Sequence, residues 1–148
     1  MYKNILVAID DSETSRCALS EALNIARAAS AKLFITHVAD EALLNMHGHV
    51  LSHMADADGA SDKLSQAGQK LLDDAMATAT GVAAETLLLH GSNRRVSETI
   101  ADKAGELGVD LIVIGRHGRR GLATFILGSV AEQLAKIANA SVLLVRKH

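Results

Sequence analysis

The sequence predicts an α/β fold: a doubly wound, five-stranded parallel sheet in the order 3-2-1-4-5, with helices on both faces. Short apolar runs rich in Val, Ile and Leu recur five times along the 148 residues, and longer segments with helical periodicity separate them. Such runs, in which apolar and polar residues do not alternate, are typical of parallel strands covered on both faces. The order βαβαβαβαβ and the length together indicate a single domain over residues 1–148.

The first strand is expected at Ile5–Ile9 and the second at Leu33–Val38. Between them, a helix from about Ser12 to Ala29 begins at Asp11 or Ser12, since both residue types cap helices. Small apolar residues recur on one face of this helix and allow it to pack closely on the sheet. These residues are Ala18, Ala22, Ile25, Ala26 and Ala29.

The second helix is expected from about Ser61 to Thr78, and the third strand at Thr86–Leu89. Gly81 lies between them and suits a helix C-terminus, where the left-handed conformation is common. The helical spacing of apolar residues predicts the buried face of the helix. Its members are Leu64, Ala67, Leu71, Leu72 and Ala75.

The last elements are a third helix at about Val96 to Leu107, a fourth strand at Leu111–Ile114, a fourth helix at about Ser129 to Ala138 and a final strand at Val142–Val145. Gly108 suits the end of the third helix. The periodicity of the fourth helix directs three apolar residues toward the core. They are Val130, Leu134 and Ile137.

Ligands bind to doubly wound sheets at the carboxyl ends of the strands, where the winding direction reverses. In the predicted order this reversal falls between the first and fourth strands, which brings Asp10 opposite Gly115. Asp10 has two interpretations: it satisfies backbone donors at the start of the first helix, or it accepts a hydrogen bond from a ribose hydroxyl. The sequence leaves both open, and the position at the reversal favours the ribose.

A glycine pattern follows the fourth strand: G-x-x-G from Gly115 to Gly118, then nine residues, then Gly128 and Ser129. Glycines lack Cβ atoms, so backbone N–H groups can approach an anion closely, in conformations that other residues avoid. Ser129 and Glu132 match the S-x-x-E capping box, which predicts a helix N-terminus that favours negative charge. The combination predicts a phosphate-binding loop.

An adenine base also needs an apolar pocket, and three aliphatic residues at the same edge could form it. Val38 ends the second strand, and its backbone could pair with an adenine edge, although a plain core role is the alternative. Ile9 and Ile114 would supply apolar walls.

Composition argues against several other partners. The formal net charge is −2, and the aromatic residues number one Tyr and two Phe, which is too few for base-stacking platforms, so nucleic acid is not expected. The apolar runs are too short to span a membrane. Cys17 is the only cysteine and can form no intrachain disulfide, which fits a cytoplasmic protein.

Four segments together closely resemble the universal stress protein family. The first strand carries Val-Ala-Ile-Asp-Asp-Ser, and the fourth carries Asp-Leu-Ile-Val-Ile-Gly-Arg-His-Gly-Arg-Arg-Gly. The other two are Gly-Ser-Val-Ala-Glu and the final Ser-Val-Leu-Leu-Val-Arg. The resemblance covers nearly the whole chain. Its most specific element is the spacing G-x-x-G, nine residues, G-S, which marks the ATP-binding branch of that family.

The resemblance implies a binding site for ATP, with Mg or Mn bound through the phosphates. It implies that Ala8 and Ile9 line the base pocket, that Asp10 contacts the ribose and that Val38 presents its backbone to adenine. The residues implied around the phosphates are Gly115, Gly118, Gly128, Ser129 and Val130. It also implies a homodimer through the last strand, Ser141 to Arg146. Arg116 departs from the family, which usually has Ser or Thr there, and it either reaches a phosphate or points to solvent.

The segment from residue 40 to 60 is longer than a usual connection and holds His47, His49 and His53. His49 and His53 would share one face of a helix, but no fixed metal-ligand spacing is matched, so we predict a polar loop and no metal site.

The expected function is that of an ATP-binding regulatory protein of the stress response, acting as a dimer with an unidentified protein partner. No nucleophile, base and orienting group form an evident set, so a dedicated enzyme is not expected. The alternatives are a slow Mg- or Mn-dependent ATP hydrolase and a nucleotide-free dimeric interaction module.

Overall fold

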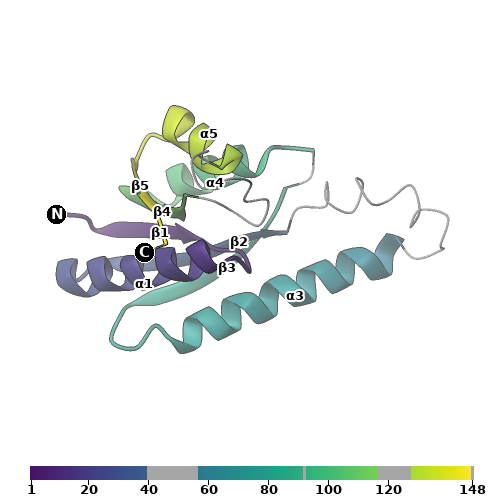
Figure 1. Ribbon diagram of the computed structural model, residues 1–148, viewed down its shortest axis with the longest axis horizontal. Coiled ribbons are helices and arrows are strands. Elements are labelled where there is room, and N and C mark those ends of the chain that lie inside the picture. The colour runs from purple at the N-terminus through teal and green to yellow at the C-terminus, as the bar shows by residue number, and fades with distance from the viewer. Residues whose placement is uncertain (40–56, 92, 117–127, 148) are drawn as a thin grey trace.

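The computed structural model describes residues 1–39, 57–91, 93–116 and 128–147, and Figure 1 shows their arrangement. Helices and strands alternate along the described chain, as predicted. They are β1 (Asn4–Ala8), α1 (Glu13–Ala29), β2 (Lys32–Ala39), α3 (Ala57–Ala77), β3 (Ala84–His90), α4 (Val96–Glu106), β4 (Leu111–Gly115), α5 (Ser129–Ile137) and β5 (Ser141–Val145).

The described strands form one five-stranded sheet in the order β3-β2-β1-β4-β5. Every neighbouring pair is parallel. In the register, Ala8 of β1 lies beside Thr36 of β2 on one side and Ile114 of β4 on the other. Helices α1 and α3 cover one face of the sheet, and α4 and α5 cover the other (Figure 1). The predicted fold class and strand order are confirmed.

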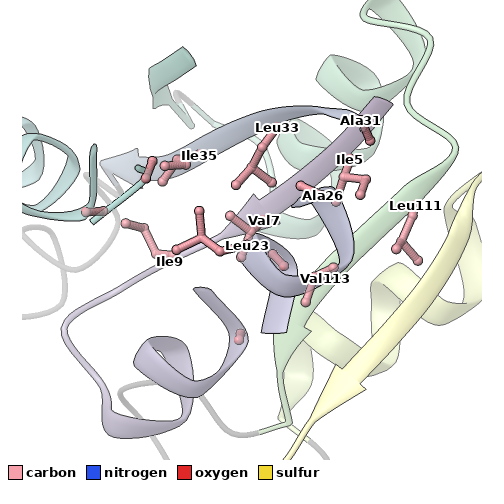
Figure 2. Close-up of a cluster of buried hydrophobic side chains, with 14 of the residues drawn as sticks. Ile5, Val7, Ile9, Leu23, Ala26, Ala31, Leu33, Ile35, Leu111 and Val113 are labelled. Atoms are coloured by element: carbon pink, nitrogen blue, oxygen red, sulfur yellow. The ribbon is translucent and has the colours of Figure 1, made fainter. Parts of the chain in front are cut away.

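The core beneath α1 and α3 is built on the central strands, and Figure 2 shows it. Ile5, Val7, Leu33 and Ile35 have no accessible surface. Burying such a side chain stabilises the fold by about 1.5–3 kcal/mol. Helix α1 approaches these strands closely because its buried positions carry small residues. They include Ala18, Ala22 and Ala26.

A second core lies between the sheet and the helices α4 and α5. It combines strand residues that alternate with those of the first core, such as Leu6 and Ile112, with Ile100 of α4 and Leu134 of α5. Because both faces of the strands are buried, neither face needs polar residues. This explains why apolar and polar residues hardly alternate along the strand sequences.

The helix ends follow the sequence closely. Ser12 is the N-cap of α1, and its side chain accepts a hydrogen bond from the Ser15 N–H. Gly81 and Gly108 have φ angles of 73° and 62°, in the left-handed region that glycine adopts without strain. Gly108 directly follows the C-cap of α4, as predicted, whereas Gly81 lies in the turn between the end of α3 at Ala77 and the start of β3 at Ala84.

Helix α3 differs from the prediction in its start and in its buried face. It begins at Ala57 rather than near Ser61. Ala67, which we expected to be buried, is exposed, and Gly68 is buried instead. A Cβ atom on Gly68 would lie 2.8 Å from Cδ2 of His37 and 2.9 Å from Cδ1 of Leu88. The missing side chain therefore sets how closely α3 sits on β2 and β3.

Two smaller differences concern strand β1 and helix α5. Strand β1 ends at Ala8, so Ile9 is the first residue beyond it. In α5, Ile137 is 41% exposed rather than buried, and Ala131 occupies the buried face with Leu134. In the ranges that the structure describes, no helix combines the length and apolarity that a membrane span requires.

Candidate functional site

The candidate site lies at the carboxyl ends of β1 and β4, where the winding direction of the sheet reverses. The chain leaves β1 toward α1 on one face and leaves β4 toward α5 on the other (Figure 1). Loops that part to opposite faces open a crevice at the edge of a doubly wound sheet. The described residues that were predicted to bind a ligand lie at the ends of β1, β2 and β4 and at the start of α5.

Hydrogen bonds fix the loop that follows β1. The Ile9 N–H donates to the Thr36 carbonyl at 2.8 Å, which extends the β1–β2 pairing by one residue. Nδ1 of His37 donates to the Ile9 carbonyl at 2.8 Å. The Asp10 N–H donates to Oγ of Ser15 at 2.8 Å. The peptide groups on both sides of Ile9 are thus held in place.

Asp10 takes part in the start of helix α1. Its Oδ1 accepts a hydrogen bond from the Ser12 N–H at 2.8 Å, as in an Asx turn. The interpretation of Asp10 as a residue that satisfies backbone donors is therefore confirmed. A carboxylate has about four acceptor positions, so this role is compatible with a ribose hydroxyl as a further partner.

Gly115 is required by packing and not by an unusual backbone angle. Its φ lies outside the left-handed range, contrary to the expectation that both glycines of the loop would use it. A Cβ atom at this position would lie 2.9 Å from Oγ1 of Thr14 and 3.0 Å from the Thr14 carbonyl carbon. The first turn of α1 thus rests directly on the end of β4.

The two ends of the glycine pattern meet in space. The Gly128 N–H donates to the Arg116 carbonyl at 2.8 Å, and the Arg116 N–H donates to the Val145 carbonyl of β5 at 2.7 Å. These bonds hold the start of α5 beside the end of β4. Arg116 is half-buried. Gly118 and His117 lie outside the described residues.

The start of α5 differs from the predicted capping box. Gly128 is the N-cap, with φ −58° and ψ 144°, and Ser129 is the first helical residue. The first helical bond runs from the Glu132 N–H to the Gly128 carbonyl at 2.9 Å, and the Glu132 side chain pairs with Lys136. Among the described residues, no side chain caps this helix. No described side chain therefore competes with an anion for the N–H groups of the first turn, at Ser129 and Val130.

The apolar residues predicted for the base pocket divide between the two faces of the sheet. Ala8, Val38 and Ile114 belong to the core on the α4 and α5 side. Ile9 belongs to the opposite core, beside Leu23 and Ile35 (Figure 2). The side chains of Ile9 and Ile114, which we expected to supply apolar walls of one pocket, thus enter different cores, because the first residue after β1 continues the alternation of the strand.

Sequence reasoning missed two residues of β2 next to this site. Thr36 is fully buried, and its Oγ1 has no hydrogen-bond partner among the described residues. His37 holds the Ile9 carbonyl, as described above. The sequence does hold a signal for Thr36 and His37: they form a polar pair inside the otherwise apolar run Leu-Phe-Ile-Thr-His-Val.

The described residues include no group of three or more His, Cys, Asp or Glu side chains that could hold a metal ion. The predicted polar loop with His47, His49 and His53 lies outside the described residues.

The parallel sheet and the site at its winding reversal define a doubly wound α/β protein with a candidate ligand site for an anionic group. The chain belongs to the universal stress protein family, whose family model matches residues 1–146. It is 35% identical to the universal stress protein YxiE of Bacillus subtilis (strain 168) over 153 aligned positions, which cover 99% of this chain and all of the relative.

Solved structures agree with this assignment. A universal stress protein family member from Burkholderia pseudomallei superposes with a TM-score of 0.72 at 33% identity, covering 97% of this chain and 96% of the other. A universal stress protein determined in complex with cAMP superposes with a TM-score of 0.69 at 25% identity, covering 97% of each chain. The second structure identifies an adenine nucleotide as the ligand of that protein.

Proposed function

We propose that this chain is an ATP-binding universal stress protein that acts in the cytoplasm as a nucleotide-dependent regulatory dimer of the stress response. The observation that carries the proposal is the hydrogen bond between the Gly128 N–H and the Arg116 carbonyl, at 2.8 Å. This bond places the N-terminus of α5, which no described side chain caps, beside the end of β4, where a phosphate would meet several backbone donors. The complex of a related protein with cAMP supports an adenine nucleotide as the ligand.

In the proposed complex, the site residues take the roles that the family resemblance implies. Asp10 accepts from the ribose, and the backbone of Val38 pairs with adenine. Ala8 and Ile9 line the base pocket, and Ile114 supplies an apolar wall. Mg or Mn would be bound through the phosphates. The phosphates lie among Gly115, Gly118, Gly128, Ser129 and Val130.

The proposed dimer forms through the edge strand β5, whose residues after Ser141 are only partly buried. The Ser141 N–H and the Val145 carbonyl point toward β4 and its flanking residues. By the alternation of a strand, the backbone groups of Val142 and Leu144 point outward, available to a second copy. Leu144→Pro should therefore convert the dimer to a monomer in sedimentation analysis without breaking the pairing with β4, and a variant that stays dimeric would argue against this interface.

A thermal-shift comparison tests nucleotide binding. ATP, ADP, AMP, cAMP and GTP are each added with Mg²⁺ after any carried-over nucleotide has been removed. At a hundredfold excess over Kd, binding adds about 2.7 kcal/mol, which raises the Tm by roughly 5–10 °C for a domain of this size. We expect adenine nucleotides to raise the Tm more than GTP.

The variant Gly128→Asp separates the phosphate site from general stability. The carboxylate would cap α5 and interact well with its dipole, so the protein should be at least as stable as the wild type. The same carboxylate would occupy the backbone donors and repel phosphate, so the ATP-induced shift should disappear. Gly105→Asp is the matched control, since Gly105 is exposed on α4 and its Cβ would meet nothing within 4 Å. Flat curves for the wild type with every nucleotide would instead favour a nucleotide-free interaction module.

A further inference from the structure

The peptide groups on both sides of Ile9 are clamped to strand β2. The Ile9 N–H donates to the Thr36 carbonyl at 2.8 Å, and the Ile9 carbonyl lies 2.8 Å from Nδ1 of His37. A carbonyl oxygen accepts hydrogen bonds and cannot donate them, so Nδ1 must carry the hydrogen atom. The imidazole is therefore held in one tautomer when it is neutral.

This clamp acts directly on the residue that we propose to bind ribose. Asp10 follows Ile9, and the hydrogen bonds described for it join it to nearby residues, to Ser12 at the N-cap of α1 and to Ser15 in its first turn. The His37 bond differs because it joins residues 28 positions apart and ties the loop to the sheet. Fixing the Ile9 carbonyl fixes the peptide plane from which the Asp10 backbone continues.

Helix α3 holds the imidazole from the other side. A Cβ atom on Gly68 would lie 2.8 Å from Cδ2 and 3.4 Å from Nε2 of His37. The backbone of α3 thus packs against the edge of the ring that faces away from Ile9. His37 is half-buried between these two contacts.

We infer that His37 is a positioning residue of the nucleotide site: it orients the Asp10 loop through the Ile9 carbonyl, and α3 orients His37 through Gly68. The role rests on the nucleotide-binding function proposed above and adds to it a connection between α3 and the ribose subsite. Binding is favoured when the loop is held before the ligand arrives, because less ordering then accompanies association.

Two substitutions at His37 separate the hydrogen bond from the packing. His37→Asn keeps an N–H donor close to the position of Nδ1, whereas His37→Leu fills similar space without a donor. Loss of one neutral hydrogen bond predicts an ATP Kd about threefold to tenfold higher for His37→Leu. His37→Asn should remain within about twofold of the wild type. Titration calorimetry well below the Tm of each variant measures this, since a loss of stability alone does not change the Kd of a folded protein.

A double-mutant cycle tests whether His37 acts through Asp10. Asp10→Ala should weaken ATP binding, and His37→Leu should then cause little further loss, because the contact that it positions is already gone. His90→Leu serves as the control: His90 is exposed at the end of β3, and its loss should leave the Kd unchanged.

The outcomes are distinct. His37 would have no positioning role if the wild type and His37→Leu bound ATP equally well. The same would follow if the effects of His37→Leu and Asp10→Ala on the Kd were fully additive. Neither result would contradict the nucleotide site itself. Failure of the wild type to bind any adenine nucleotide would overturn the proposed function and this role together. We expect His37→Leu to bind ATP weakly and His37→Asn to bind it about as well as the wild type. We also expect the double-mutant cycle to be non-additive.

Discussion

Replacing Gly115 with alanine should destabilise the protein even though the backbone angles at this position suit alanine. The added Cβ would lie 3.0 Å from the carbonyl carbon of Thr14, whereas ordinary van der Waals contact begins near 3.4 Å, so the first turn of α1 must retreat by 0.4 Å. Such overpacking costs about 1–3 kcal/mol. For a domain of this size, the Tm should fall by roughly 2–12 °C.

Thermal and urea unfolding of Gly115→Ala measure this cost. The matched control is Gly105→Ala, at an exposed helical position where the new Cβ meets nothing within 4 Å. There the same substitution should stabilise α4 by about 0.5–1 kcal/mol, the opposite sign. An unchanged or raised Tm for Gly115→Ala would refute the packing explanation.

The double variant Thr14→Ala with Gly115→Ala tests which atoms of Thr14 resist the change. Removing the Thr14 hydroxyl eliminates the contact at 2.9 Å, but the carbonyl carbon at 3.0 Å and Cβ at 3.1 Å remain. The rescue should therefore be less than half of the loss, after correction for Thr14→Ala alone. Complete rescue would show that the side chain, and not the backbone of α1, causes the clash.

Three further substitutions should change stability in predictable directions. Thr36→Val removes a buried hydroxyl that has no partner among the described residues. In the absence of nucleotide, the free energy of unfolding should rise by about 1 kcal/mol and the Tm by roughly 2–4 °C. A decrease would mean that this hydroxyl has a partner. Gly68→Ala should lower the stability by about 1–3 kcal/mol, because its Cβ would meet the anchored ring of His37, and its unfolding midpoint in urea measures the loss. Ser12→Ala removes the N-cap of α1 and should lower the free energy of unfolding by about 1 kcal/mol. Ser129→Ala should lower it little, because Gly128 is the N-cap of α5. Equal Tm values for these two variants would contradict the assignment of caps.

Much of the fold could be predicted because it depends on patterns that the sequence displays directly. The strands are buried on both faces, so their apolar runs stand out between amphipathic helices. Gly81 and Gly108 mark two of the connections from a helix to the next strand, because their positive φ angles suit glycine. The alternation of strands and helices predicts a doubly wound parallel sheet, and the order 3-2-1-4-5 is a common order of that class.

The details that could not be predicted depend on contacts between distant segments. Gly68 was not assigned to the buried face of α3, because hydrophobic periodicity counts side chains and glycine has none. Ile9 was placed beside Ile114 because both are aliphatic and end neighbouring strands. The face that each side chain occupies follows from the register, in which Ala8 and not Ile9 lies beside Ile114. A register is a property of two paired strands, so one strand alone does not determine it.

The two glycines at the site therefore carry different weight for the proposed function. A glycine at position 115 is explained by the fold, because the backbone of α1 occupies the place of a side chain. The backbone angles of Gly128, φ −58° and ψ 144°, do not require glycine, because they are open to any residue. Serine or aspartate at this N-cap would accept hydrogen bonds from the N–H groups of the first turn. Relative to glycine, it would stabilise α5 by about a few tenths of a kcal/mol. A glycine here leaves those donors to a ligand, which makes Gly128, rather than Gly115, the residue whose identity favours phosphate binding.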